Sequence, residues 1–168
     1  MSAQDLMNSM LDATVENTEF ESEFKTVPEI DSAFGQITKW DLKAGSSIRD
    51  GEERPWARLE LTWNVDSPEA REEIGRDEVN VKQQIMLSFE PGTTSLSKTQ
   101  NITLGRLIKL FDIEASELST RELFDCFVGK QGTVKVGHVP MMKGKNDPMR
   151  DDDGNQIFRA EIVAVGRI

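Results

Sequence analysis

The stretch WARLELTWNV, residues 56–65, decides the fold class because its apolar and polar side chains alternate. Successive side chains of an extended strand point to opposite faces of a sheet, so this pattern predicts a strand with one buried face. We expect four large side chains in the core: Leu59, Leu61, Trp63 and Val65. The opposite face begins with Trp56 and Arg58, which we expect outside the core.

Four further stretches predict strands, and a helical region separates the third strand from the fourth. Residues 56–65 are the second of the five predicted strands. The other four, in chain order, are GQITKWDLK (35–43), VNVKQQIMLSF (79–89), GTVKVGHVP (132–140) and IFRAEIVAVGRI (157–168). In the strand at 79–89 we expect Phe89 on the core side with the valines. Apolar spacing of three and four predicts a helix over 102–111, with Asn101 as its cap. Ser119 and Glu122 match a capping box and predict a second helix to Phe127.

The order of three strands, a helical insert and two strands is typical of an OB-type barrel. This five-stranded Greek-key barrel binds oligonucleotides on the face of its second and third strands, and with the loops after its first and fourth strands. Those loops correspond here to residues 44–55 and 141–156, both rich in charge. We therefore predict a mainly β, five-stranded OB-type barrel over residues 31–168.

Residues 1–30 form a distinct acidic N-terminal arm, with seven acids and one lysine. The arm begins with a predicted short amphipathic helix that carries four apolar side chains on one side: Leu6, Met7, Met10 and Leu11. Two interpretations stay open. The arm is either a disordered solubilising leader or a docking peptide, which would bind a replication or recombination protein or the barrel's own basic groove.

The net charge of −10 argues against an ordinary nucleic-acid binder, because phosphate contacts usually come from a basic surface. The distribution of charge weakens this objection. Outside the arm, the chain has 19 basic and 23 acidic residues, so the predicted barrel is only mildly acidic. No stretch approaches the ~20 apolar residues that span a bilayer, and we expect a cytoplasmic protein without membrane contact.

Several absences favour a binding protein over an enzyme, with no cofactor and no metal. Cys126, expected on the buried side of its helix, and His138 are the only cysteine and histidine, so neither a disulfide nor a Cys/His zinc site can form within the chain. The stretch DDDGN, residues 151–155, resembles a calcium loop, but that alignment puts Met149 and Ala160 where acids are needed. We predict a solvated hairpin tip there instead, and we expect no catalytic residues.

Binding of single strands without sequence preference combines aromatic rings that stack on bases with cations that pair with phosphates. The candidates lie in and beside the first three strands and in the last hairpin: Trp40, Lys43, Trp56, Arg58, Lys82, Phe89, Lys143, Lys145 and Arg150. Lys39, in the first predicted strand, is a further basic candidate. The competing interpretation places Trp40 in the core and makes the lysines ordinary solvated charges.

From Phe34 to Ile168 the chain resembles small bacteriophage single-stranded DNA-binding proteins of the OB type. The resemblance is carried by four stretches: GQITKWDLK, TWNV, ITLGRLIKLF and LFDCFVGKQGTVKV. It implies cooperative coating of single strands in phage DNA replication or recombination, in the cytoplasm of an infected host cell. It also implies stacking aromatics on the second and third strands, here Trp56 and Phe89. The chain departs from the commonest pattern because VAVGRI at its end predicts a strand, whereas the acidic tail is at the other end.

A second class of function stays open, a phage structural or adaptor protein that makes only protein contacts. Such a protein would suit the acidic surface better than a nucleic-acid binder. The sequence leaves open whether the chain forms a homo-oligomer.

Overall fold

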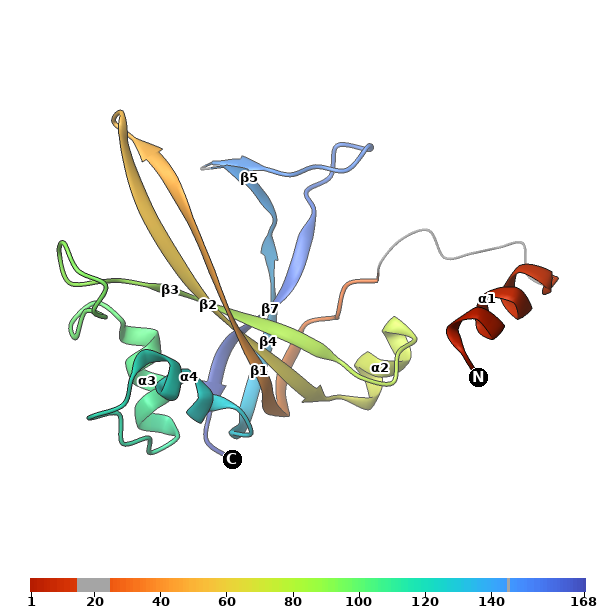
Figure 1. The fold of residues 1–168 in the computed structure, drawn as a ribbon, viewed down its shortest axis with the longest axis horizontal. Coiled ribbons are helices and arrows are strands. Elements are labelled where there is room, and N and C mark those ends of the chain that lie inside the picture. The colour runs from red at the N-terminus through yellow and green to blue at the C-terminus, as the bar shows by residue number, and fades with distance from the viewer. Residues whose placement is uncertain (15–24, 145) are drawn as a thin grey trace.

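The computed structural model describes residues 1–14, 25–144 and 146–168. Its longest elements, β1 (Ile30–Arg49) and β2 (Glu52–Asp66), pair as one antiparallel hairpin. Asp50 and Gly51 form the turn with φ of 53° and 77°, as a two-residue turn with both central residues at positive φ requires. The prediction of a loop over residues 44–55 was therefore wrong: the Asp-Gly pair alone turns the chain, and the residues beside it continue the ladder. The hairpin projects as a long arm (Figure 1).

The five predicted strands are confirmed in their order, and they form one mainly antiparallel sheet. β3 (Asn80–Leu87) pairs with β2, and β4 (Gln131–Pro140) pairs with both β1 and β7 (Phe158–Gly166). β3 meets β7 in parallel at Lys82 and Glu161. The order is thus β1-β2-β3-β7-β4, and the pairing of β4 with β1 makes a ring of strand pairs.

The core contains the side chains that the alternation of β2 predicted. Leu59, Leu61 and Trp63 are fully buried, and Trp63 Nε1 donates a hydrogen bond of 3.0 Å to Gln83 Oε1. Val79, just before β3, and Val81, Ile85 and Leu87 within it are buried as expected. Phe89 is not: it lies beyond the end of β3, in an isolated bridge with Leu96, and remains 36% exposed.

Two helices between β3 and β4 lie at one end of the sheet (Figure 1). They are α3 (Ile102–Leu110) and α4 (Thr120–Phe127), and the predicted capping box of Ser119 and Glu122 is confirmed. Asn101 makes no cap bond at α3, contrary to prediction. Its side-chain amide instead bonds the backbone of Ser88 and Ser97, which ties the loop after β3. Cys126 is only partly buried.

The polar segment after β2 contains a short helix, α2 (Pro68–Ile74). Ser67 caps the helix, Pro68 occupies its first turn, and Gly75 ends it in the left-handed conformation. The loop predicted over 141–156 contains β5 (Met142–Gly144) and β6 (Asp147–Pro148).

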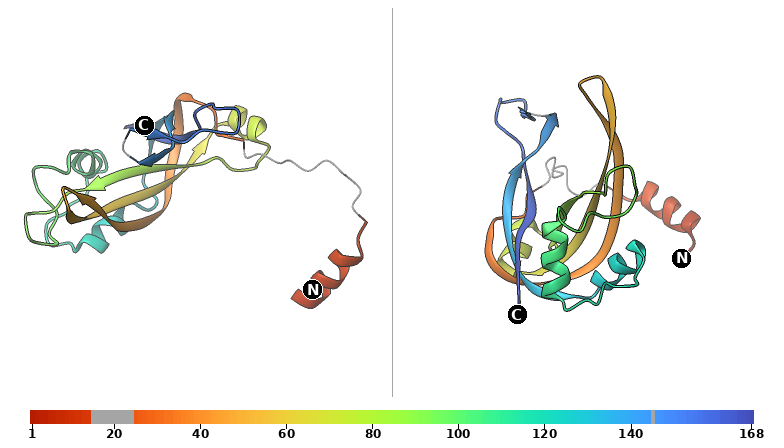
Figure 2. Two further views of the ribbon diagram at one scale, coloured as in Figure 1. Left: turned by 90° about the horizontal axis from the view of Figure 1, so that it is seen from above. Right: turned by 90° about the vertical axis from the view of Figure 1, so that its left-hand side faces the viewer.

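The acidic tip at 151–155 is a tight turn, as predicted. The Asp151 carboxylate accepts hydrogen bonds from the backbone N–H groups of Asp153 and Asn155, at 3.0 and 2.9 Å. Arg150 and Gln156 pair across this turn. The tip of the β4–β7 hairpin and the β1–β2 arm project on the same side of the sheet (Figures 1 and 2).

The N-terminal arm contains the predicted helix, α1 (Ala3–Asp12), and none of its residues is buried. The end of the predicted arm lies against the sheet, because Val27 packs on the core and its carbonyl accepts a 2.7 Å hydrogen bond from His138 Nε2. Residues 15–24, which hold most of the arm's acids, are outside the described residues. None of the described helices is long and apolar enough to cross a membrane.

Candidate nucleic-acid interface

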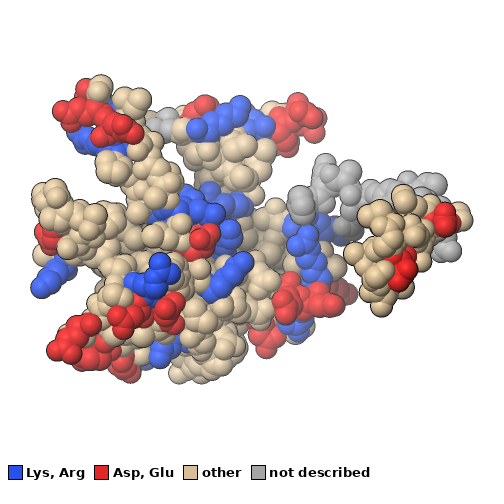
Figure 3. All heavy atoms as spheres, viewed as in Figure 1, with Lys and Arg blue, Asp and Glu red and all other residues tan. Residues whose placement is uncertain are grey.

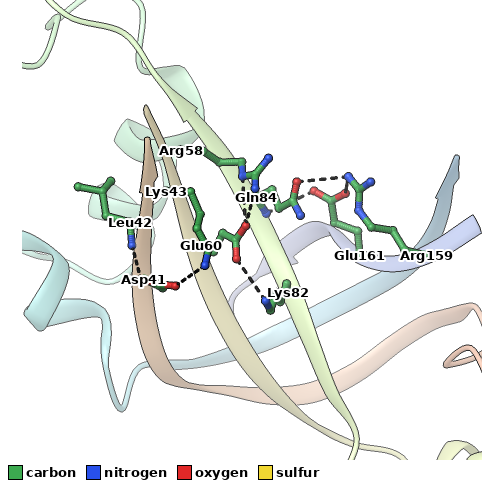
Figure 4. A network of polar contacts seen from close by, with 9 residues as sticks. All are labelled: Asp41, Leu42, Lys43, Arg58, Glu60, Lys82, Gln84, Arg159 and Glu161. Atoms are coloured by element: carbon green, nitrogen blue, oxygen red, sulfur yellow. Dashed lines mark hydrogen bonds and ion pairs between the residues drawn. The ribbon is translucent and has the colours of Figure 1, made fainter. Parts of the chain in front are cut away.

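The outward face of β1, β2 and β3 forms one continuous surface. Across the β1–β2 pair, Lys43 lies opposite Arg58, and Gly45 lies opposite Trp56. Across the β2–β3 pair, Lys82 lies opposite Thr62. Because directly paired residues share a face, the register places these aromatic and basic side chains together, away from the core. Figure 4 shows Lys43, Arg58 and Lys82 on this surface.

The Trp56 indole packs closely against β1 because its partner across the strand pair is a glycine. A Cβ atom on Gly45 would lie 2.7 Å from Trp56 Cζ2, so any larger residue would displace the indole. The Arg58 guanidinium carbon is 5.6 Å from the ring centroid, within the range of cation–π attraction. The ring is half-buried, and this seating holds it as a preformed aromatic surface on the sheet.

A buried carboxylate, Glu60, pairs with two basic side chains: Arg58, which lies beside Trp56, and Lys82 of β3. The Glu60 side chain is 5% exposed; its Oε2 is 2.8 Å from Arg58 Nη2, and its Oε1 is 3.2 Å from Lys82 Nζ. Burial alone would raise the pKa of Glu60, but the hydrogen bonds and charges of Lys82 and Arg58 outweigh it and lower that pKa. One negative charge thus holds two positive charges, and the cluster keeps one positive charge.

A second polar cluster connects β3 to β7 (Figure 4). Arg159 Nη2 donates to Gln84 Oε1 at 3.3 Å and to Glu161 Oε2 at 3.0 Å, while the Gln84 backbone N–H donates to Glu161 Oε1 at 3.3 Å. Within the described part of the chain, Arg159 Nε is buried without a hydrogen-bond partner.

The balance of charge on this face differs from that of the chain. The basic side chains on and beside it are Lys39, Lys43, Arg58, Lys82 and Arg159. The acids paired with them are Asp41, Glu60 and Glu161. Figure 3 shows basic side chains gathered at the base of the hollow between the two arms, while acidic and basic side chains are interspersed over the rest of the visible surface. A face with more cations than acids is what a bound polyanion requires.

Glu60→Gln is expected to lower the free energy of unfolding by about 1–3 kcal/mol at neutral pH, because it removes a charge that two partly buried hydrogen bonds engage. A carboxyl whose pKa is lower in the folded state stabilises the protein above its ordinary pKa of 4.5, and that contribution is lost as the pH falls below it. The parent should therefore lose more stability in acid than Glu60→Gln does. Urea melts at neutral and acidic pH measure the difference, and equal acid responses would contradict the assignment.

Four of the predicted residues meet on this face: Lys43, Trp56, Arg58 and Lys82. Trp40 does not join them, because it lies on the core side of β1. Its Nε1 donates a 2.8 Å hydrogen bond to Asp125 Oδ1, and its ring packs edge-on against Phe124 at 5.4 Å. The competing interpretation of this tryptophan fits the geometry better than base stacking does.

Three of the remaining candidates lie in other described segments: Phe89, Lys143 and Arg150. Phe89 lines an open groove with Arg54, between the loop after β3 and the β1–β2 arm. Lys143 is in β5, and Arg150 donates to the carbonyl of Gly154 in the acidic turn. Lys145 is outside the described residues.

Sequence reasoning missed Arg159, Gln84 and Glu161. In β7, alternation with buried Ile162 puts Arg159 and Glu161 on the outward face, and in β3 alternation with buried Ile85 does the same for Gln84. Only the parallel contact of β3 with β7 brings the three side chains together. Within residues 1–14, 25–144 and 146–168, no group of three or more His, Cys, Asp or Glu side chains is placed to hold a metal ion.

Comparison of the chain with models of protein families, with curated proteins and with solved structures finds no match in any of the three.

Proposed function

We propose that this chain is an OB-type protein that binds single-stranded DNA on the outward face of β1, β2 and β3, without strong sequence preference. The strand order supports this proposal, because β1 pairs with both β2 and β4 and the helical insert lies between β3 and β4. OB folds bind oligonucleotides on this part of the sheet and with the loops after the first and fourth strands. Here those connections are the two arms beside the face.

The observation that carries the proposal is the joint placement of Trp56, Arg58 and Lys82. An indole seated on the sheet can stack on a base of any identity, and stacking contributes about 1–3 kcal/mol per base. Glu60 pairs with Arg58 and Lys82 at 2.8 and 3.2 Å, so little side-chain freedom is lost when these two cations meet phosphates. The sequence's resemblance to phage single-stranded DNA-binding proteins is the reason for assigning this activity to phage DNA replication or recombination, in the host cytoplasm.

The experiment that tests the proposal is a salt series of oligo-dT titrations, followed by fluorescence polarisation. The parent should bind more weakly as salt rises, because each neutralised phosphate of a single strand adds about 0.7 to the slope of log K against log salt. Arg58→Ala and Lys82→Ala should each reduce that slope by a little under one unit. Lys135→Ala, at an exposed lysine of β4 outside this face, is the matched control and should leave the slope unchanged.

Equal slopes for all three variants would remove Arg58 and Lys82 from the interface. If the parent binds no oligonucleotide at either low or moderate salt, the adaptor function replaces DNA binding. The exposed Leu42 and Ile48 of the β1–β2 arm, 45% and 79% accessible, favour a protein partner in that case.

Deletion of residues 1–24 tests the role of the acidic arm. The deletion spares Val27 and its bond with His138, so the sheet should melt as the parent does. Because residues 1–24 hold six acids and no basic residue, which is −6 of the net charge of −10, we expect their removal to leave oligo-dT binding at least as tight, with the largest gain at low salt. Weaker binding after the deletion would show that the arm contributes to the interface or docks a partner copy.

A further inference from the structure

The same outward face contains a hollow of about 440 Å³ beyond the Glu60 cluster. Its polar lining includes three amides, two lysines and one acid: Gln36, Asn64, Asn80, Lys39, Lys82 and Glu78. A volume of this size lies within the range of about 300–1,000 Å³ that small-molecule sites occupy. The hollow is thus large enough for one base of a strand that crosses the face.

A β-bulge in β1 shapes this hollow. The register with β2 shifts between Ile37 and Lys39, which makes Thr38 the extra residue. Thr38 Oγ1 donates to the carbonyl of Thr62 at 3.3 Å, so the bulge is bonded to the neighbouring strand. Bulges bend a strand locally and redirect side chains, and here Gln36 and Lys39 line the hollow on either side of Thr38.

Some of the hydrogen-bonding groups that line the hollow have a partner within the described part of the protein, and others do not. Asn64 Nδ2 donates to Asn80 Oδ1 at 3.4 Å, which leaves the other amide atoms of this pair without a partner in the described residues. Glu78 is exposed and, when ionised, only accepts hydrogen bonds. A ligand that enters the hollow therefore meets amide donors and acceptors together with one group that requires a donor.

We propose that this hollow is a subsite for one base of the bound strand and that it favours cytosine over uracil. The inference rests on the proposed function and deepens it. The exocyclic amine of cytosine donates to the Glu78 carboxylate, a pairing that acidic side chains make with this base, while the amides bond the rest of the base edge. Uracil presents a carbonyl oxygen at the same position, which leaves two acceptors facing each other. Lys39 and Lys82 lie where they can pair with the flanking phosphates.

The test compares oligo-dC with oligo-dU of one length at neutral pH, because the two bases differ only in the group at position 4 and the proton at N3. The parent should bind oligo-dC about fivefold more tightly or better. Glu78→Gln should bring the ratio of the two dissociation constants close to one, since a glutamine amide can serve either base. Asn64→Ala should also reduce the ratio, and a denaturant melt checks that each variant is folded.

Glu72→Gln is the matched control, because it makes the same charge change at an exposed residue of α2 outside the hollow. It should keep the ratio of the parent, whatever it does to overall affinity. Equal binding of oligo-dC and oligo-dU by the parent, or a ratio that survives in Glu78→Gln, would overturn the subsite and leave the proposed function standing. Binding of neither oligonucleotide would overturn both.

Discussion

Trp63→Ala is expected to lower the free energy of unfolding by about 3–5 kcal/mol, the usual cost of truncating a large buried aromatic residue. Trp63 is fully buried between Gly35, whose built Cβ would lie 3.1 Å from Trp63 Cε3, and the ring of Phe111 at 6.4 Å. The truncation also leaves Gln83 Oε1 buried without its donor. Urea melts followed by far-UV circular dichroism measure the loss.

If Trp63→Ala does not fold, the milder variant Trp63→Phe still tests this prediction. It keeps most of the ring and removes the indole N–H, so it should lose less stability than the alanine variant. Val163→Ala, at a β7 residue that is 50% exposed, should melt close to the parent. A Trp63→Ala protein as stable as Val163→Ala would show that β2 presents its other face to the core.

Trp56→Ala is expected to weaken oligo-dT binding by about 1–3 kcal/mol, or roughly 5- to 150-fold, with little loss of stability. The reason is the position of the Trp56 side chain, which packs on Gly45 at the outward face and is not part of the buried core. Polarisation titrations at fixed salt measure the affinity, and a urea melt of the same sample measures stability.

Two variants sharpen the result for Trp56. Trp56→Phe keeps an aromatic ring and should recover part of the affinity. Ile48→Ala changes an exposed apolar residue of the same hairpin and should bind like the parent if only the ring matters. If Trp56→Ala binds like the parent and instead loses stability, the indole serves to pack the hairpin and not to bind DNA.

The sequence predicts the strand faces well because alternation is a local property. Each of the four apolar core residues expected in β2 could be assigned from its neighbours two positions away, and the capping box at Ser119 needs only four residues. The Asp50–Gly51 turn was equally local and was missed, because the charged residues around it favoured a loop over a continued hairpin.

The candidate site was only partly predictable because its remaining features depend on distant parts of the chain. By simple alternation from Ile37, Trp40 would face outward, but the bulge at Thr38 puts it opposite buried Leu61, where Asp125 of α4 accepts its indole N–H. Arg159 meets Gln84 only through the β3–β7 contact, which spans more than seventy residues of sequence. The bulge at Thr38 leaves no mark in the pattern of residue types, so the hollow beside it could not be expected.

The three tryptophans offer the most direct test of the central claim, that single-stranded DNA binds the outward face of β1, β2 and β3. Each gives one indole N–H signal in a ¹H–¹⁵N NMR spectrum, assigned by single Trp→Phe variants. Addition of oligo-dT should shift the Trp56 signal and leave those of Trp40 and Trp63 nearly in place, because Asp125 and Gln83 hold their N–H groups away from this face. An unchanged Trp56 signal at saturating oligo-dT, or shifts confined to Trp40 or Trp63, would contradict the account.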